Sequence, residues 1–320
     1  MGKHVNRVAI VGSGFVGSTY AYALMNQGIA EEIVLIDINK AKAEGDAMDL
    51  NHGKLFTPSP AKVWHGDYSD CKDADIVCIS ASVSQSEEET RLTVVEKNTA
   101  IVKDVVEKVM ASGFDGIFLV VSNPVDIITY ATWEFSGLPK ERVIGSGTTL
   151  DTARLLFLLG EYFRIDPRSI NGYIIGEHGD SQIASFSTAT ICGKPLLDIV
   201  TSDSQNRLTD LEKIANDVRD AAYHVWDRKG ATYFGIGMAL ARITKAILRN
   251  ENIILPVSAY LDGEYGFHDV YVGVPAVINR QGISKIIELD LNQAEQEKLT
   301  SSINILKSTM EPLFKNKARL

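Results

Sequence analysis

A histidine between two glycines is the first feature of the sequence that could do chemistry. His178 lies at the centre of the sequence GEHGD (176–180), directly after an apolar segment that predicts a strand at 173–175. An imidazole gives or takes a proton near neutral pH, and a glycine-rich polar segment after a strand favours a loop open to a cleft. A lone histidine is more often structural than catalytic, but this setting makes His178 a candidate functional residue.

A second polar motif, LDTAR (150–154), precedes it in the chain. Asp151 and Arg154 are three residues apart at the start of a predicted helix, so they share one helix face. They could serve one site. They could equally form a surface ion pair of little energetic value. The spacing alone leaves both interpretations open.

The sequence GSGFVG (12–17) matches the pattern GxGxxG and follows a short apolar run. Gly12 would allow a tight turn, Gly14 would let the backbone approach a pyrophosphate, and Gly17 would let the next helix pack on the strand. Asp37 ends the following predicted strand, 20 residues after Gly17. A carboxylate there accepts hydrogen bonds from a ribose and repels a ribose phosphate, which favours NAD over NADP.

The first half of the chain contains apolar segments of strand length that alternate with helical segments. Strands are expected at 8–11, 33–36, 76–79 and 117–121, and helices at about 15–27, 40–50 and 91–111. Continuous apolar strands separated by helices are typical of a parallel sheet covered on both faces. We therefore predict an α/β fold, with a Rossmann, doubly wound parallel sheet in an NAD-binding domain at 1–145.

The pattern changes after about residue 145. Further helices are expected at 150–163, 206–228, 231–248 and 292–314, and strands near 173–175, 184–191, 253–260 and 270–277. This mixture predicts a second, α+β domain at 146–320. It contains Asp151, Arg154 and His178 and is the expected substrate and catalytic domain. No linker rich in Pro, Gly or Ser separates the two domains.

Composition excludes several classes of protein. The 320 residues are 45% hydrophobic and 23% charged, as in an ordinary globular protein. The net charge of −9 argues against nucleic acid or anionic lipid as a partner. No apolar run reaches the roughly 18 residues of a membrane helix. Three cysteines without a CxxC pair, together with the lack of a targeting signal and of a metal-ligand motif, predict a cytoplasmic protein with reduced thiols and no metal.

Taken together, the motifs GSGFVG, SNPVD, IGSGTTLDTAR and GEHGD resemble the lactate/malate dehydrogenase family, and the resemblance extends from Val8 to the final helix. It implies that His178 exchanges a proton with a 2-oxo or 2-hydroxy acid. Asp151 would orient His178 and favour its protonated form, while Arg154 would bind the substrate carboxylate.

The resemblance also assigns roles to residues elsewhere in the chain. Arg91 would polarise the reacting carbonyl, and Asn123 would bond the substrate oxygen or the nicotinamide region. Thr232 would line the substrate pocket. The residues expected to contact the cofactor are Gly12, Gly14, Phe15, Val16, Gly17, Asp37, Ser146 and Ile236.

Within the family, the substrate is read by a loop that precedes Arg91, and Gln85 falls at the specificity position. Glutamine there goes with lactate and pyruvate, whereas arginine goes with malate and oxaloacetate. No Lys or Arg occurs from Asp73 to Thr90, so the loop lacks a cation for a second carboxylate. Leaving that carboxylate unpaired would be costly, which argues against malate. The expected enzyme is an NAD-dependent L-lactate dehydrogenase of fermentation.

Two departures from the family pattern keep alternatives open. Ser86, Glu87 and Glu88 stand where relatives have lysine, proline and glycine. This acidic run could be a solvated surface, or it could alter loop closure and broaden specificity towards hydroxyisocaproate-type acids. Arg168 matches an arginine of the fructose 1,6-bisphosphate site of some relatives, but Asn171 replaces its histidine, which puts activation by that effector in doubt.

Self-association as a homotetramer or dimer is a further implication of the resemblance. The alternative from a different class is a catalytically silent NAD-binding protein, because fold does not determine function. The joint presence of His178, Asp151, Arg154 and Arg91 speaks against it.

Overall fold

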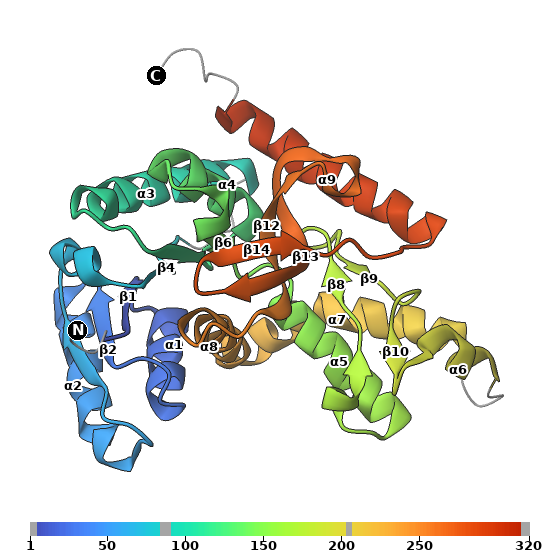
Figure 1. Cartoon of the computed structure of the whole chain (residues 1–320), viewed down its shortest axis with the longest axis horizontal. Coiled ribbons are helices and arrows are strands. Elements are labelled where there is room, and N and C mark those ends of the chain that lie inside the picture. The colour runs from blue at the N-terminus through green and yellow to red at the C-terminus, as the bar shows by residue number, and fades with distance from the viewer. Residues whose placement is uncertain (1–4, 84–90, 203–206, 315–320) are drawn as a thin grey trace. The chain divides into compact units, whose positions relative to one another are not determined.

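The computed structural model describes residues 5–83, 91–202 and 207–314, without the side chains of Arg91 and Leu92 (Figure 1). The described chain forms two compact units. The first consists of the residues up to Ser146 together with Tyr233–Ile253 and Val277–Lys285. The second consists of Gly147–Thr232, Ile254–Ala276 and the residues from Ile286 onward.

A parallel sheet forms the centre of the first unit. Its strands pair in the order β6-β5-β4-β1-β2-β3, and each of these pairs is parallel. The strands are β1 (Arg7–Val11), β2 (Glu32–Ile36), β3 (Lys62–His65), β4 (Ile76–Ile79), β5 (Ile117–Val120) and β6 (Val143–Gly145). Their side chains are almost all buried, as the continuous apolar runs require. The doubly wound α/β fold predicted from the sequence is confirmed.

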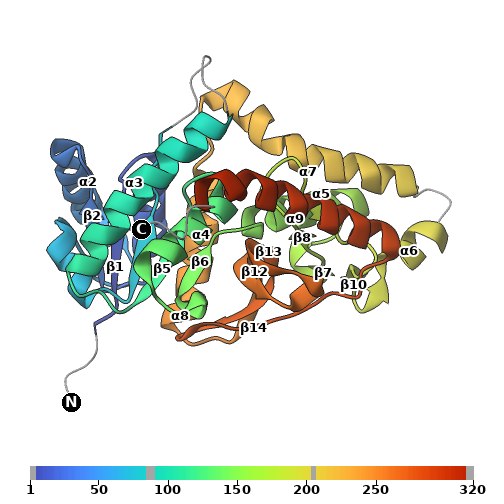
Figure 2. The ribbon, with the colours of Figure 1, turned by 90° about the horizontal axis from the view of Figure 1, so that it is seen from above.

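Helices cover both faces of this sheet. Figures 1 and 2 show α3 (Arg91–Ala111) beside α4 (Val125–Ser136). Figure 1 shows α1 (Phe15–Asn26) beside α8 (Phe234–Leu248), and α2 (Lys40–Gly53) follows β2. Short 3₁₀ helices lie at Lys54–Phe56, Tyr68–Asp73 and Lys140–Arg142.

The packing of α8 on α1 explains why a late segment of the chain joins the first unit. A Cβ added at Gly237 would lie 2.7 Å from Cγ2 of Thr19, so the two helices approach closely there. The buried hydroxyl of Tyr20 also makes a hydrogen bond with Thr244. The compact units are therefore not contiguous segments of the chain. The assignment of NAD binding to 1–145 and of substrate binding and catalysis to 146–320 stays a prediction.

The second unit combines helices with short antiparallel strands. Its pairs are β11-β10-β7 in one sheet and β8-β9 in another. The elements are α5 (Thr149–Phe163), a 3₁₀ helix (Pro167–Ser169), β7 (Ile170–Asn171), β8 (Ile174–Ile175), β9 (Ile183–Ala184), β10 (Thr190–Ile191), β11 (Lys194–Pro195), α6 (Leu196–Ser202), α7 (Leu208–Lys229), a 3₁₀ helix (Glu264–Gly266) and α9 (Gln293–Phe314).

Three strands late in the chain contain residues of both units. They are β12 (Ile253–Asp262), β13 (His268–Asn279) and β14 (Gly282–Ile286).

The single strand expected at 184–191 is not present. The segment forms β9 and β10 with a turn between them, in which Thr188 N–H donates to the carbonyl of Ser185. Polar Ser185, Ser187 and Thr188 favour such a turn because their hydroxyls compete for backbone hydrogen bonds. The buried carboxylate of Glu295 in α9 accepts hydrogen bonds from the backbone and hydroxyl of Ser187 and so holds the turn.

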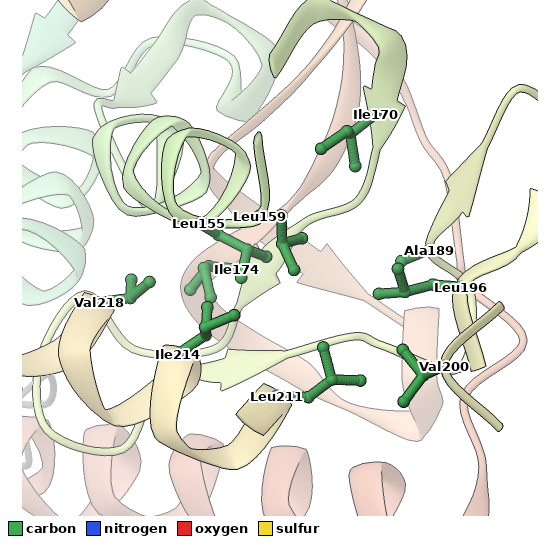
Figure 3. Close-up of a cluster of buried hydrophobic side chains, with 10 residues drawn as sticks. All are labelled: Leu155, Leu159, Ile170, Ile174, Ala189, Leu196, Val200, Leu211, Ile214 and Val218. Atoms are coloured by element: carbon green, nitrogen blue, oxygen red, sulfur yellow. The ribbon is translucent and has the colours of Figure 1, made fainter. Parts of the chain in front are cut away.

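An apolar cluster joins α5, α6 and α7 in the second unit (Figure 3). Leu155 and Leu159 project from α5 towards Leu211 and Ile214 of α7. The face of α5 that carries Leu155 and Leu159 packs against α7 and the strand residue Ile174.

Replacing a cluster residue should destabilise the protein more than the same change one turn away. Leu211 is 2% exposed and Leu208 is 52% exposed on the same helix. We expect Leu211→Ala to lower the free energy of unfolding by about 2–5 kcal/mol, because it leaves a cavity. Leu208→Ala should change it by less than about 0.5 kcal/mol. Denaturant unfolding followed by circular dichroism measures both values, and equal losses would contradict this packing.

Candidate active site

The glycine loop after β1 has the shape required for a bound pyrophosphate. Gly12 has φ +101°, and a Cβ there would lie 2.7 Å from the backbone nitrogen of Ala81. A Cβ at Gly17 would lie 1.9 Å from the carbonyl oxygen of Gly12, so only glycine lets α1 start this close to β1. Gly14 is exposed and an added Cβ would meet nothing within 4 Å, which leaves its backbone open to a ligand.

Asp37 lies against this loop. Its Oδ2 accepts the backbone N–H of Ser13 at 2.6 Å and the hydroxyl of Ser13 at 3.2 Å, while Oδ1 accepts the N–H of Asn39 at 2.8 Å. The strand register explains why Asp37 lies beside the glycine loop, because Val11 of β1 pairs with Ile36 of β2. A carboxylate beside the open glycine backbone fits the ribose next to a pyrophosphate, so these residues suit NAD.

Lys42 is a neighbour of this loop that the sequence did not single out. Its ammonium group donates to the carbonyl of Ser13 and pairs with Asp46 at 2.6 Å. In sequence it resembles any exposed lysine near a helix start, so no pattern distinguishes it.

In the second unit, one buried carboxylate binds two of the predicted residues. His178 Nδ1 lies 2.6 Å from Oδ2 of Asp151, and Arg154 Nη1 donates to Oδ1 at 2.8 Å. The side chains of Asp151, Arg154 and His178 are 2%, 17% and 26% exposed. The surface-pair interpretation of Asp151 and Arg154 is therefore wrong, because this pair is largely removed from solvent.

The electrostatics of Asp151 follow from this placement. Burial by itself would raise the pKa of the carboxyl group. The charges of His178 and Arg154, and the hydrogen bonds from both, outweigh burial and lower the pKa of Asp151 below its ordinary value. Asp151 thus stays ionised and can stabilise a positive imidazolium beside it.

Two buried threonines connect the start of α5 to the strand that precedes His178. The hydroxyl of Thr148 donates to the carbonyl of Ile174 at 2.6 Å, and Thr152 accepts the N–H of Ile174 at 2.8 Å. Gly176 then exchanges backbone hydrogen bonds with Gly273 of β13 at 2.9 and 3.0 Å. These contacts hold β8 against α5, so that His178 emerges beside Asp151.

Asn98 connects three backbone groups of the first unit and was missed in the sequence. Its side chain accepts the N–H of Val83 at 2.8 Å and donates to the carbonyls of Val83 at 3.3 Å and Asn123 at 2.8 Å. It is 2% exposed and lies on the buried face of α3 between Val95 and Val102. A polar residue on an otherwise apolar helix face is the signal that could have revealed it.

The remaining predicted residues occupy varied positions. Asn123 is exposed after β5, and Ser146 is buried after β6, where its N–H donates to Val120. Thr232 precedes α8 and is partly buried, as are Ile236 in the first turn of α8 and Val16 in α1. Exposed Phe15 stacks on Tyr233 with ring centroids 5.2 Å apart.

The predicted residues just before and at the start of α3, and those of the proposed effector site, are not among those placed in the glycine-loop group or the Asp151 group. Gln85 lies outside the described residues, and Arg91 is described only as the first backbone residue of α3. Arg168 is 90% exposed and makes a bidentate contact with Asp166 at 2.9 and 2.6 Å. Asn171 is exposed in β7.

Other chemistries find little support in the described residues. Burial raises the pKa of the Cys71 thiol to about 12 and raises that of Cys78 as well, so neither forms a thiolate near neutral pH. Cys192 is exposed. Within the described ranges, the side chains of His, Cys, Asp and Glu do not gather in groups of three or more that could hold a metal ion. A helix able to cross a membrane is not found there either.

Comparison with known proteins gives consistent matches along the chain. Residues 6–145 match the family model of the lactate/malate dehydrogenase NAD binding domain, and 148–317 match that of the alpha/beta C-terminal domain. The chain is 60% identical over 313 residues to L-lactate dehydrogenase 2 of Peribacillus psychrosaccharolyticus, covering 98% of each. It is 60% identical over 310 residues to the L-lactate dehydrogenase of Geobacillus sp. (strain WCH70), covering 97% of each.

Solved structures show the same likeness in three dimensions. The minor L-lactate dehydrogenase from Enterococcus mundtii in its ligand-bound form matches with a TM-score of 0.96 and 49% identity, over 97% of this chain and 99% of that one. The lactate dehydrogenase MGS-M5 from a deep-sea metagenome library matches with a TM-score of 0.94 and 51% identity, with the same coverage. The chain belongs to the lactate/malate dehydrogenase family.

Proposed function

We propose that the chain is an NAD-dependent L-lactate dehydrogenase that interconverts pyruvate and (S)-lactate. The observation that carries the proposal is the shared carboxylate of Asp151, which binds His178 at 2.6 Å and Arg154 at 2.8 Å. A proton donor held beside a carboxylate-binding cation suits a 2-oxo acid, whose carbonyl is next to its carboxylate. The relatives named L-lactate dehydrogenase support pyruvate among these acids.

His178 acts as the acid in pyruvate reduction. Its Nδ1–H donates to Asp151, so Nε2 is the nitrogen that gives a proton to the carbonyl oxygen. Asp151 remains ionised and offsets the charge of the imidazolium before the proton leaves. In lactate oxidation the neutral imidazole takes the hydroxyl proton back.

Arg154 holds the substrate by its carboxylate. The bond to Asp151 uses Nη1, so Nη2 and Nε can make a bidentate contact with the carboxylate. We assign carbonyl polarisation to Arg91, a bond to the substrate oxygen to Asn123, and part of the substrate pocket to Thr232, on the basis of the family resemblance.

NAD(H) is the cofactor of this family's NAD-binding domain. When bound, it supplies or accepts the hydride at the substrate carbon while the proton moves through His178, so that charge and electrons balance. The glycine loop would bind its pyrophosphate through backbone N–H groups, and Asp37 would accept from its ribose. Ser146 and Ile236 are proposed to contact its nicotinamide end.

Substrate choice is proposed from the sequence before Arg91. Gln85 and the lack of Lys or Arg from 73 to 90 favour pyruvate over the dicarboxylate oxaloacetate. The acidic run at 87–89 supports a second candidate, a dehydrogenase that accepts larger, branched 2-oxo acids. A silent NAD-binding protein would have no chemical need for the group formed by His178, Asp151 and Arg154.

The proposal extends to assembly and location. Leu55 and Phe56, after α2, are 85% and 84% exposed in the single chain, which supports a homodimer or tetramer that covers them. We propose a cytoplasmic enzyme. Because Arg168 is already bound by Asp166 and Asn171 carries no charge, we expect weak or no activation by fructose 1,6-bisphosphate.

A substrate panel tests the proposed activity. We expect NADH oxidation with pyruvate to exceed that with 4-methyl-2-oxopentanoate and with oxaloacetate, with or without fructose 1,6-bisphosphate. Absorbance of NADH at saturating cofactor gives kcat/KM for each acid. A preference for the branched acid would establish the second candidate. Efficient oxaloacetate reduction would contradict the role of Gln85, and intact NADH binding without turnover would indicate the silent protein.

Removing the charge of Asp151 should impair proton transfer. We expect Asp151→Asn to lower kcat/KM for pyruvate by about 10²–10⁴-fold, because the amide no longer favours imidazolium. The pH of half-maximal reduction should move to lower values, since protonating His178 then requires more acid. Binding of NADH, measured by fluorescence titration, serves as the control and should change little. A variant with the normal rate and pH profile would rule out this role.

A further inference from the structure

A ring of hydrogen bonds surrounds the residue before His178, and the reaction as described does not use it. The backbone N–H of Glu177 donates to Oγ of Ser302 in α9 at 2.9 Å, 125 residues away in the chain. Oγ of Ser181 donates to Oε2 of Glu177 at 2.5 Å, and the two serine hydroxyls lie 2.9 Å apart. Ser302 is 0% exposed and Glu177 is 3% exposed.

The direction of each hydrogen bond in this ring follows from counting protons. A serine hydroxyl has one hydrogen, and an ionised carboxylate only accepts. Ser181 uses its hydrogen on Glu177, so Ser302 must donate to Ser181. Ser302 therefore accepts a hydrogen bond from the backbone N–H of Glu177 and donates one to Ser181. Ser181 in turn donates to the carboxylate of Glu177, which closes the ring. Each bond polarises the next, so the loss of one hydroxyl weakens the whole ring.

The two glycines that flank Glu177 and His178 make room for this ring. A Cβ at Gly176 would lie 2.9 Å from Oγ of Ser302, and a Cβ at Gly179 would lie 3.2 Å from the carboxyl carbon of Glu177. α9 therefore packs directly against the backbone of the loop. The glycines serve this close contact as well as loop conformation.

We propose that Ser302 is a positioning residue for His178. Asp151 orients the imidazole from α5, while Ser302 and Ser181 hold the backbone on the other side, at Glu177. The loop is thus held from α5 and from α9, and the imidazole is oriented before substrate binds. This proposal rests on the proposed function for its kinetic consequences, but the placement of His178 can be measured without turnover.

Several charged groups also face this loop and contribute to its field. Asp151 and Arg154 lie on α5, and Glu177 and Asp180 lie in the loop itself. A neighbouring cavity of about 710 Å³ is lined by Ser181 and by charged groups of α7 and α9. These groups are Glu212, Arg219, Glu295 and Lys298. Ser302→Ala leaves all of these charges in place, so its effect reports the ring and not a lost charge.

The kinetic test compares Ser302→Ala with Ser301→Ala, an exposed serine one residue earlier in α9. In Ser302→Ala we expect kcat for pyruvate to fall about 10-fold or more, with KM changed less than about 3-fold, since Ser302 does not touch substrate. The pH of half-maximal reduction should move lower, in the direction expected for Asp151→Asn. Ser301→Ala should match the unaltered protein, and Ser302→Cys, which keeps a weak donor and acceptor, should recover part of kcat.

A second measurement follows the protonation of the His178 imidazole and does not depend on turnover. The pH titration of His178, followed by NMR and assigned with His178→Gln, should have a lower midpoint in Ser302→Ala than in Ser301→Ala. An unchanged His178 midpoint together with unchanged kcat would overturn the positioning role. If the unaltered protein reduces no 2-oxo acid, the proposed function fails, and the titration still decides whether Ser302 positions His178.

Discussion

The hydrogen bonds of the buried Asp151 carboxylate are the interactions on which the arrangement of His178 and Arg154 in the second unit depends. At 2% exposure the carboxylate cannot remain ionised without partners, and His178 and Arg154 each bind one of its oxygens. Removing one partner from a buried charge typically costs about 3–5 kcal/mol, so the three side chains constrain one another strongly. The same constraint assigns Nδ1 of His178 to Asp151, which is why the proposed proton transfer uses Nε2. Stability and the proposed proton transfer therefore depend on one geometry.

The first unit depends on a different constraint, the alignment of parallel strands. Because β1 pairs in register with β2 and β4, the residues that follow these strands lie at one edge of the sheet. The glycine loop lies there, and Asp37 contacts it through Ser13. The strand order reverses between β1 and β4, and Gly12 lies close to Ala81 just after β4. This is where doubly wound sheets bind ligands. Asp37 also holds the glycine loop through Ser13, so the residue proposed to read the ribose also shapes the phosphate loop.

Local sequence patterns predicted the features of the site that depend on residues close together in the chain. The glycine spacing, Asp37 after its strand, and the shared helix face of Asp151 and Arg154 could all be read from the sequence. Contacts between distant segments could not. Asn98 bonds to Val83 and Asn123, Ser302 bonds across 125 residues to Glu177, and α8 joins the first unit through α1. The strand expected at 184–191 was wrong because Glu295, more than 100 residues away, holds a turn at Ser187.

The polar groups buried around His178 explain why such distant residues matter. Thr148 and Thr152 hold β8 from α5, while Ser302 holds Glu177 from α9. Each of these groups would carry a desolvation penalty of about 1–3 kcal/mol if its partner were lost, so alternative loop conformations are disfavoured from both sides. An imidazole whose orientation is set before binding does not draw on substrate binding energy to become ordered. The residue proposed as the acid of the reaction is thus oriented by buried contacts outside the group formed by Asp151 and Arg154.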